Sequence, residues 1–459
     1  MAYRPSDKYT QMLHAPIPRL VTRLAIPTII SMLVTAFYNM ADTFFVGRLG
    51  TSATAAVGVV FSMMALIQAF SFFFGHGSGN FISRALGAHD EDSARRMAST
   101  GFFCALIAGA VLAVVGILFS RPLARLMGAT ATILPYAVDY MRIILIGAPW
   151  MMASLVLNNQ LRFQGSAFYG MIGIASGAIL NIALDPLMIF TFRMGIAGAA
   201  LATIFSQFVS FCLLLYGTRR AGNLTVSIKN FTPNAEYLKG ILNGGLPSLC
   251  RQGLNSIGTI CLNNGAALYG DAAIAAMSIV GRIVLFANSC VIGFGQGFQP
   301  VCGFCYGAKR YDRVKRAFSF SVRTVTVFLC CAGVLGFTLA PGLVGLFRKE
   351  DADVIAIGAK ALRAQCLTFP LSGWIVLCNM MMQTIGKSAK ASFLAMARQG
   401  LFFVPAILIL PRLFGITGLQ ISQPAADIVT FLVSIPLQLS VFREMDLEVP
   451  PQPDISENS

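Results

Sequence analysis

The second half of the chain repeats the first half at a nearly constant distance along the sequence. Pro27 recurs as Pro247 and Gly50 recurs as Gly270, each 220 residues later. The same spacing, with a slip of one residue in two cases, relates four further pairs: Gly87 and Gly307, Gly195 and Gly415, Pro149 and Pro370, Gly165 and Gly386. A repeat of this length is too long for a solenoid unit, so it indicates two homologous halves that each form a lobe.

The composition places both halves in a membrane. Hydrophobic residues make up 56% of the chain and charged residues only 12%, which is too little charge to cover a soluble protein. Twelve apolar segments are long enough to cross ~30 Å of hydrocarbon as helices. They are expected at about 23–46, 54–77, 97–119, 135–158, 169–191, 196–217, 242–266, 274–299, 318–340, 355–380, 393–411 and 417–440. The predicted fold is an all-α integral membrane protein with twelve transmembrane helices in two homologous six-helix lobes.

The distribution of basic residues predicts the orientation. Lys and Arg accumulate on the cytoplasmic side of membrane proteins, and here they gather before the first span and after spans two, six and eight. These residues include Arg19, Arg23, Arg84, Arg95, Arg96, Arg219, Arg220, Lys229, Lys239, Lys309, Arg310, Arg313, Lys315 and Arg316. Exceptions occur on the opposite side, at Arg121, Arg125, Arg348 and Lys349. Both termini are therefore expected in the cytoplasm of a multi-pass protein of the plasma or inner cell membrane.

The same asymmetry has two further consequences. Each half has an even number of spans, so the halves share one topology and are expected to be related by a pseudo-two-fold axis along the membrane normal. The net charge of +15 is explained by the basic cytoplasmic loops, and a nucleic-acid partner is not predicted. No obligate protein partner is evident in the sequence.

The spans divide the chain into five parts. These are a cytoplasmic N-terminal segment 1–22, an N-terminal lobe 23–217, a cytoplasmic linker 218–240, a C-terminal lobe 241–440 and a cytoplasmic tail 441–459. The first 20 residues are polar and no cleavage site follows the first apolar run, so the first span is expected to act as the insertion signal. Prolines among acidic residues predict disorder from residue 444 onward.

Cysteine, histidine and glycine motifs suggest packing rather than chemistry. Cys302 and Cys305 form a C-x-x-C pattern at the end of a span with no strand before it, so we expect both to pack as small apolar side chains. The three histidines are scattered, which predicts no metal site, and no cofactor is expected. No nucleophile and base pair is recognisable, which argues against an enzyme. The glycine-rich segments 75–79 and 293–297 are expected to allow close helix packing.

Three aspartates fall within the apolar segments. A carboxylate at the centre of a bilayer costs about 2.5 kcal/mol or more, so each is a functional-site hypothesis. Asp42 and Asp185 lie at the same predicted depth, toward the outer side of the N-terminal lobe. Asn181 precedes Asp185 by one helical turn, and Thr203 begins the sixth span at nearly the same level. These residues predict a polar cluster, whose alternative role is a hydrogen-bonded knot that holds helices together.

The third acid, Asp427, lies in the C-terminal lobe without a second acid nearby in the sequence. Pairing with Arg251, Arg282 or Arg398 would make it structural.

Three motifs resemble those of the multidrug and toxic compound extrusion (MATE) transporters. They are Tyr-Asn-Met-Ala-Asp at 38–42 running into Phe-Val-Gly at 45–47, Asn-Asn-Gln-Leu-Arg at 158–162 before Gly165, and Asn-Ile-Ala-Leu-Asp-Pro at 181–186. In this order, inside a duplicated chain of twelve spans, the resemblance covers essentially the whole sequence. It implies two six-helix lobes, a central cleft that opens alternately to each side of the membrane, and export driven by protons or sodium ions.

The resemblance also implies a site. One prokaryotic branch of the family carries its coupling acids in the N-terminal lobe, and the matching positions here are Asp42 and Asp185. The polar neighbours of the ion or substrate site are then Tyr38, Asn158, Asn181 and Thr203, and Na⁺ would be held by Asp42, Asp185, Asn181 and Thr203. A straight-helix count nevertheless places Asn158 near the cytoplasmic end of its span. Another branch uses acids in spans seven and ten, which contain none here, so coupling through the C-terminal lobe is disfavoured.

The expected activity is an antiport in which an amphipathic, cationic drug or dye leaves the cell in exchange for H⁺ or Na⁺. Two nearby carboxylates disfavour being ionised together, which suits them to take up a proton or a cation. The nearest alternative is a flippase for a lipid-linked oligosaccharide or another lipid, for which Arg251, Arg282 and Arg398 would supply a cationic cleft. The sequence leaves the substrate and the choice of ion open.

Overall fold

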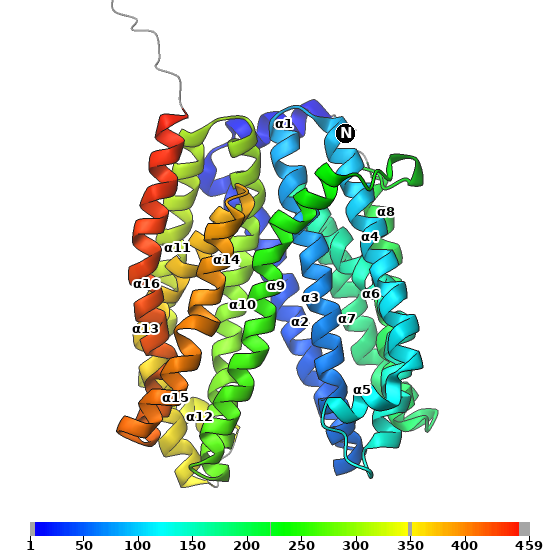
Figure 1. Ribbon diagram of the computed structural model, residues 1–459, viewed down its shortest axis with the longest axis vertical. Coiled ribbons are helices and arrows are strands. Elements are labelled where there is room, and N and C mark those ends of the chain that lie inside the picture. Colours follow the sequence, from blue (N-terminus) through cyan, green and yellow to red (C-terminus); the bar gives the residue numbers. More distant parts are fainter. Residues whose placement is uncertain (1–4, 221, 348–350, 449–459) are drawn as a thin grey trace, which may run out of the picture.

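The computed structural model describes residues 5–220, 222–347 and 351–448, and this part of the chain is helical throughout its regular structure (Figure 1). The long helices of the N-terminal half are α2 (Ile17–Gly47), α3 (Thr51–Gly87), α4 (Glu91–Leu118), α6 (Leu134–Phe163), α7 (Ala167–Pro186), which continues as the π-helix η1 (Leu187–Thr191), and α8 (Gly195–Thr218). Those of the C-terminal half are α9 (Ala235–Ala267), α10 (Asp271–Gly307), α11 (Tyr311–Thr338), α13 (Ala352–Thr384), α14 (Ser388–Met396) with η3 (Ala397–Leu401) and α15 (Phe403–Phe414), and α16 (Ile416–Leu447). Short helices are α1 (Pro5–His14), α5 (Ser120–Leu126), η2 (Ile228–Asn230) and α12 (Ala340–Gly345).

The predicted fold is confirmed as twelve membrane-spanning helical segments, six in each lobe. Eleven of the described segments are long and apolar enough to cross a membrane by themselves. The twelfth is α9, which has 33 residues but carries polar side chains such as Arg251, Asn255 and Asn263. A helix with polar groups is stable in a membrane where neighbouring helices cover it, and α9 packs against α3 and α14.

Most helices extend beyond the predicted spans. The largest extension is in α3, which was expected to end near residue 77 and continues to Gly87. Ser78, Asn80 and Ser83 lie in this extension and are fully buried. Their side chains are covered by protein rather than lipid, so low hydropathy did not end the helix there.

The two lobes pack together at the end of the molecule that carries α1 and the connection from α8 to α9, called here the α1 end. At this end the predicted close packing of both glycine-rich segments is confirmed. A Cβ on Gly77 would lie 2.4 Å from the Ile241 carbonyl oxygen, and a Cβ on Gly297 would lie 2.4 Å from the Ala25 Cα. Among the described glycines, those whose added Cβ would meet atoms of the opposite lobe all lie toward the α1 end. Toward α5 and α12, at the other end, the helices of the two lobes diverge (Figure 1).

Polar contacts also join the lobes at the α1 end. Arg162 of α6 is buried and donates to the Gln296 carbonyl at 3.0 Å and to Gln299 Oε1 at 2.8 Å, both on α10. The Nδ1 atom of His76 on α3 lies 2.9 Å from the Ser248 hydroxyl oxygen on α9. These bonds would be broken if the lobes separated at this end, so they stabilise the packed arrangement.

Helix α2 belongs to both lobes. Its first part, with Leu20 and Leu24, lies in one hydrophobic core with α10 and α11, and the Thr28 hydroxyl donates to the Gly293 carbonyl at 2.6 Å. Its last turns pack with the N-terminal lobe, where Val46 is buried in that lobe's core. Pro27 lies within the first part, directly before Thr28.

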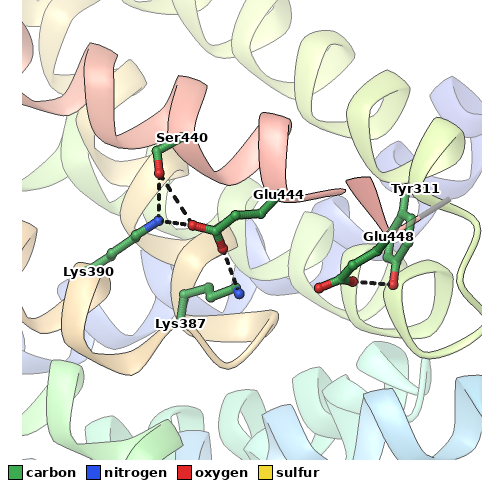
Figure 2. A network of polar contacts seen from close by, with 6 residues as sticks. All are labelled: Tyr311, Lys387, Lys390, Ser440, Glu444 and Glu448. Carbon is green, nitrogen blue, oxygen red and sulfur yellow. Dashed lines mark hydrogen bonds and ion pairs between the residues drawn. The ribbon is translucent and has the colours of Figure 1, made fainter. Parts of the chain in front are cut away.

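The C-terminal lobe ends in a helix that is longer than expected. Disorder was predicted from residue 444, but α16 continues to Leu447, so that prediction is wrong for residues 444–447. The physical reason is an ion-pair network: Glu444 binds Lys387 at 2.7 Å and Lys390 at 2.5 Å (Figure 2). The bond to Glu444 raises the pKa of Lys387, which lies between α13 and α14, and this effect outweighs the opposing effect of burial. The remainder of the tail, 449–459, lies outside the described residues.

Candidate functional site

The N-terminal lobe contains a buried polar cluster, defined here as Tyr38 and Asp42 of α2, Asn181 and Asp185 of α7, and Thr203 of α8. The side chains of Asp185, Asn181 and Thr203 are 0%, 1% and 1% exposed. Tyr38 is also buried, and Asp42 is half-buried with its Oδ1 atom enclosed. The structure therefore brings together five of the six residues that the sequence singled out.

Hydrogen bonds order one side of this N-lobe cluster. In the amide orientation that satisfies both neighbours, the Asn181 nitrogen donates to Asp185 Oδ2 at 3.1 Å and its oxygen accepts the Thr203 backbone N–H at 3.2 Å. The Thr203 hydroxyl donates to the Ala199 carbonyl one turn earlier at 3.0 Å. Asn181 thus links α7 to α8 and fixes the position of the Asp185 carboxylate.

Two buried hydroxyl groups were missed from the sequence, one beside the cluster and one on α8 one turn after Thr203. Tyr140 of α6 and Ser206 of α8 are fully buried, and neither hydroxyl has a hydrogen-bond partner among the described residues. The charges of Asp42 and Asp185 both act on Tyr140. Ser206 follows Thr203 by three residues, so helical spacing could have identified it, whereas nothing in the sequence around Tyr140 indicates that it faces α2 and α7.

The helix that carries Asp185 changes its geometry directly after this residue. Pro186 has no backbone N–H and cannot continue the α-helical bonding, and residues Leu187–Thr191 form the π-helix η1. The Phe192 N–H bonds to the Leu187 carbonyl at 2.9 Å, five residues back. Single π-turns inside α-helices occur frequently at functional sites, because they redirect the side chains next to them.

The cluster is acidic and has no internal counter-charge. Neither Asp42 nor Asp185 forms an ion pair with any Lys, Arg or His in the described part of the chain. The two carboxylates are close enough to interact electrostatically. Buried acids without a basic partner are stable only when they take up a proton or bind a cation, and carboxylate, amide and hydroxyl oxygens are ligands that hard cations prefer.

Groups of three or more His, Cys, Asp or Glu side chains that could hold a metal ion are absent from the described part of the chain. Cys302 and Cys305 are buried free thiols in α10, as expected for packing residues.

The sixth predicted residue, Asn158, lies elsewhere. It packs against Gly170 near the start of α7, where an added Cβ would meet its amide nitrogen at 2.9 Å. Gly170 precedes Asp185 by fifteen residues on the same helix, which corresponds to about 22 Å. Asn158 therefore lies outside the N-lobe cluster, at the end of its span where the straight-helix count places it.

Asp427 of the C-terminal lobe has a basic partner. Its Oδ1 atom accepts from Arg398 Nε at 2.9 Å and from Gln423 Nε2 at 3.1 Å. Of the two other arginines considered, Arg251 donates to Asn379 at 3.4 Å and Arg282 is exposed. Asp427 thus compensates the charge of Arg398, which is the pairing that a structural role requires.

The fold and this cluster define a class of protein: a two-lobed, all-helical membrane transporter, not an enzyme. The sequence model of the MatE family matches residues 27–187 and 247–408, one match in each lobe. The chain belongs to this family, which confirms both the resemblance and the internal repeat. Transporters of this family need no cofactor.

Known relatives and solved structures cover nearly the whole chain. The multidrug export protein MepA of Staphylococcus saprophyticus is 28% identical over 413 residues, which cover 90% of this chain and 91% of the relative. A multidrug resistance MATE family transporter solved in an outward-facing conformation has a TM-score of 0.91 and 28% identity, covering 95% of this chain and 98% of that one. A MOP superfamily transporter from Pyrococcus furiosus, described by the reverse polarity of its binding pocket, has a TM-score of 0.89 and 27% identity over 95% and 98% of the two chains.

Proposed function

We propose that this protein exports amphipathic, cationic small molecules from the cell in exchange for H⁺ or Na⁺, and that Asp42 and Asp185 couple the two movements. The observation that carries the proposal is the pair of carboxylates that have no basic partner in the described part of the chain. The multidrug export function named for the similar MepA proteins supports the class of substrate. Na⁺ would be held by Asp42, Asp185 and their neighbours Asn181 and Thr203.

The orientation is part of the same proposal. Both termini lie in the cytoplasm, and the protein resides in the cell membrane with the α1 end inside. Basic residues gather at that end, which supports this orientation. In this orientation, the packed lobes close the cytoplasmic side and the diverging ends face outward.

The coupling mechanism follows from the charge of the cluster. When both carboxylates are ionised, they repel one another and require water, Na⁺ or a cationic substrate between them. When they are protonated or bind Na⁺, the N-terminal lobe can close around a neutral cluster. Ion occupancy therefore changes the relative stability of the two lobe arrangements, and alternating access results. One charge moving through 100 mV supplies about 2.3 kcal/mol, which is sufficient to drive uphill export.

The experiment that tests this proposal is efflux of a lipophilic cationic dye from proteoliposomes with imposed H⁺ or Na⁺ gradients. The variants are Asp42→Asn and Asp185→Asn, and Asp139→Asn is the matched control because Asp139 is an exposed acid of the same lobe. We expect the wild type and the control to extrude dye with one of the two gradients and both cluster variants to fail. Gradient-driven efflux that persists in both cluster variants would refute the coupling role.

A further inference from the structure

A cavity lies at the α1 end, far from the N-lobe cluster, between α1, the start of α2 and the start of α7. It has a volume of about 400 Å³. Its lining combines apolar side chains of α2 with aromatic side chains of α7. The lining residues on which the argument rests are Lys8, Arg23, Leu24, Pro27, Phe168 and Tyr169.

The charges of this cavity are all positive. Lys8 and Arg23 line it, and none of its lining residues is acidic. The Lys8 amine donates to Ser166 Oγ at 2.7 Å and to Asn223 Oδ1 at 3.0 Å. Burial lowers the pKa of Lys8 to about 7, and an anion in the cavity would favour its charged form. Arg23 is exposed and forms no ion pair or hydrogen bond with the described residues, so all its donors are available.

Along the exposed face of α2, basic side chains are followed by apolar side chains. Arg19 precedes Arg23 by one turn and is likewise exposed and unpaired within the described chain. Ile26 and Ile30 follow on the same face of the helix and are 52% and 41% exposed. Two unpaired guanidinium groups are thus followed by an apolar stripe that runs about 6 Å along the helix.

Aromatic side chains form the opposite wall. Phe168 of α7 is 57% exposed although it is large and apolar, and Tyr169 beside it is half-exposed. Aromatic residues at this position are typical of the boundary between lipid headgroups and acyl chains. The arrangement of anion-binding donors above apolar walls matches the shape and polarity of a phospholipid.

We propose that this cavity binds one anionic phospholipid of the cytoplasmic leaflet. Arg19 and Arg23 hold its phosphate, the Lys8 charge adds to the attraction, and an acyl chain lies between Ile26 and Phe168. A cationic drug is excluded by the same charges, and a zwitterionic lipid gains less because its own cation is repelled. The assignment to the cytoplasmic leaflet rests on the proposed orientation.

A bound lipid would act on the transport cycle through α2. The cavity wall includes Leu24 and Pro27, in the part of α2 that packs against α10. Asp42 lies fifteen residues after Pro27 on the same helix. A lipid that fills this cavity holds α1, α2 and α7 together and favours the arrangement in which the cytoplasmic side is closed.

The test measures lipid binding separately from transport. Full-length protein is titrated with phosphatidylglycerol, phosphatidylcholine or glycerol phosphate, and bound ligand is counted by native mass spectrometry. The variant is Arg19→Gln with Arg23→Gln. The matched control is Arg219→Gln with Lys229→Gln, which removes two exposed positive charges at the same end but outside the cavity.

We expect one phosphatidylglycerol to bind the wild type and the control at least about fivefold more tightly than the cavity variant. Glycerol phosphate should not compete, since it lacks the acyl chains. Equal weakening in the control, equal binding of phosphatidylcholine, or full competition by glycerol phosphate would each overturn the proposal. A folded cavity variant is verified by its unchanged melting temperature, and dye efflux is not needed for the readout, so failure of the proposed function would not mask the result.

Discussion

The two lobes share one fold but differ in whether their buried acids are paired with a base. In the N-terminal lobe, Asp42 and Asp185 have no basic partner among the residues that the structure describes, whereas in the C-terminal lobe Asp427 is bound to Arg398. At the repeat spacing of 220 residues, the position of Asp42 is occupied by Leu262 in the second half. Duplication thus retained the helices and the glycine contacts while the charges diverged.

This difference indicates which of the buried acids can exchange ions. A buried carboxylate that is paired with a guanidinium gains nothing from a proton or Na⁺, because its charge is already compensated. An unpaired carboxylate must acquire a proton or cation to remain buried. Each lobe also has a π-helix in its fifth span, but η1 follows the acid Asp185 and η3 contains the base Arg398. We therefore expect ion exchange in the first lobe and structural stabilisation in the second.

The largest effect is expected when the first lobe is made like the second. Asp42→Leu places the C-lobe residue at the N-lobe position and leaves Asp185 without a neighbouring acid. Gradient-driven efflux should fall by about tenfold or more, because one coupling charge is lost, while folding is retained since Leu is favoured in an apolar helix. Efflux in proteoliposomes and the melting temperature together check this. Retention of full coupling would remove the distinction between the lobes.

A smaller effect, on stability rather than on coupling, is expected in the C-terminal lobe. Asp427→Asn leaves Arg398 unpaired and should destabilise the protein by about 2–4 kcal/mol, near the lower range for a buried pair because Arg398 is partly exposed. The double variant Asp427→Asn with Arg398→Gln should recover part of this loss. Both variants should retain gradient-driven efflux once their folded fraction is measured by thermal denaturation. A folded double variant without coupling would show that the second lobe also exchanges ions.

The hydroxyl groups missed from the sequence give a third prediction. Ser206→Ala and Tyr140→Phe remove hydroxyls that lack protein partners in the described structure. If these groups bind the coupling ion, its half-saturating concentration should rise by about fivefold, equivalent to about 1 kcal/mol. Ion titrations of efflux measure this, with Ser210→Ala as the control on the same helix. An unchanged ion dependence with higher thermal stability would assign both hydroxyls to packing alone.

The smallest effect is expected for Asn158→Ala. This residue packs near the start of α7, away from the N-lobe cluster, so the ion dependence of efflux should change by less than about twofold. Asn181→Ala provides the contrast, because it removes the amide that binds Asp185 and should shift the ion dependence clearly. A similar shift in both variants would contradict the separation of Asn158 from the cluster.

Much of the fold and part of the site could be predicted from the sequence. The repeat and the apolar segments predicted the lobes and their helices because membrane burial is specified by composition along the chain. The depth of Asp42, Asp185 and Asn181 followed from counting residues along each helix. The extension of α3 was not predictable in the same way, since Ser78 and Asn80 look like loop residues until their cover by other helices is known.

The sequence by itself determined the duplication, the transmembrane segments and the presence of unusual acids at one level of the first lobe. Only the tertiary structure decided that Tyr140 lies beside this cluster, that Asn158 lies away from it, and that Arg398 is the partner of Asp427. The physical reason is that a helical sequence specifies the height of each side chain along its axis. The rotation of that helix against its neighbours, and hence which side chains meet, is decided by packing among all the helices.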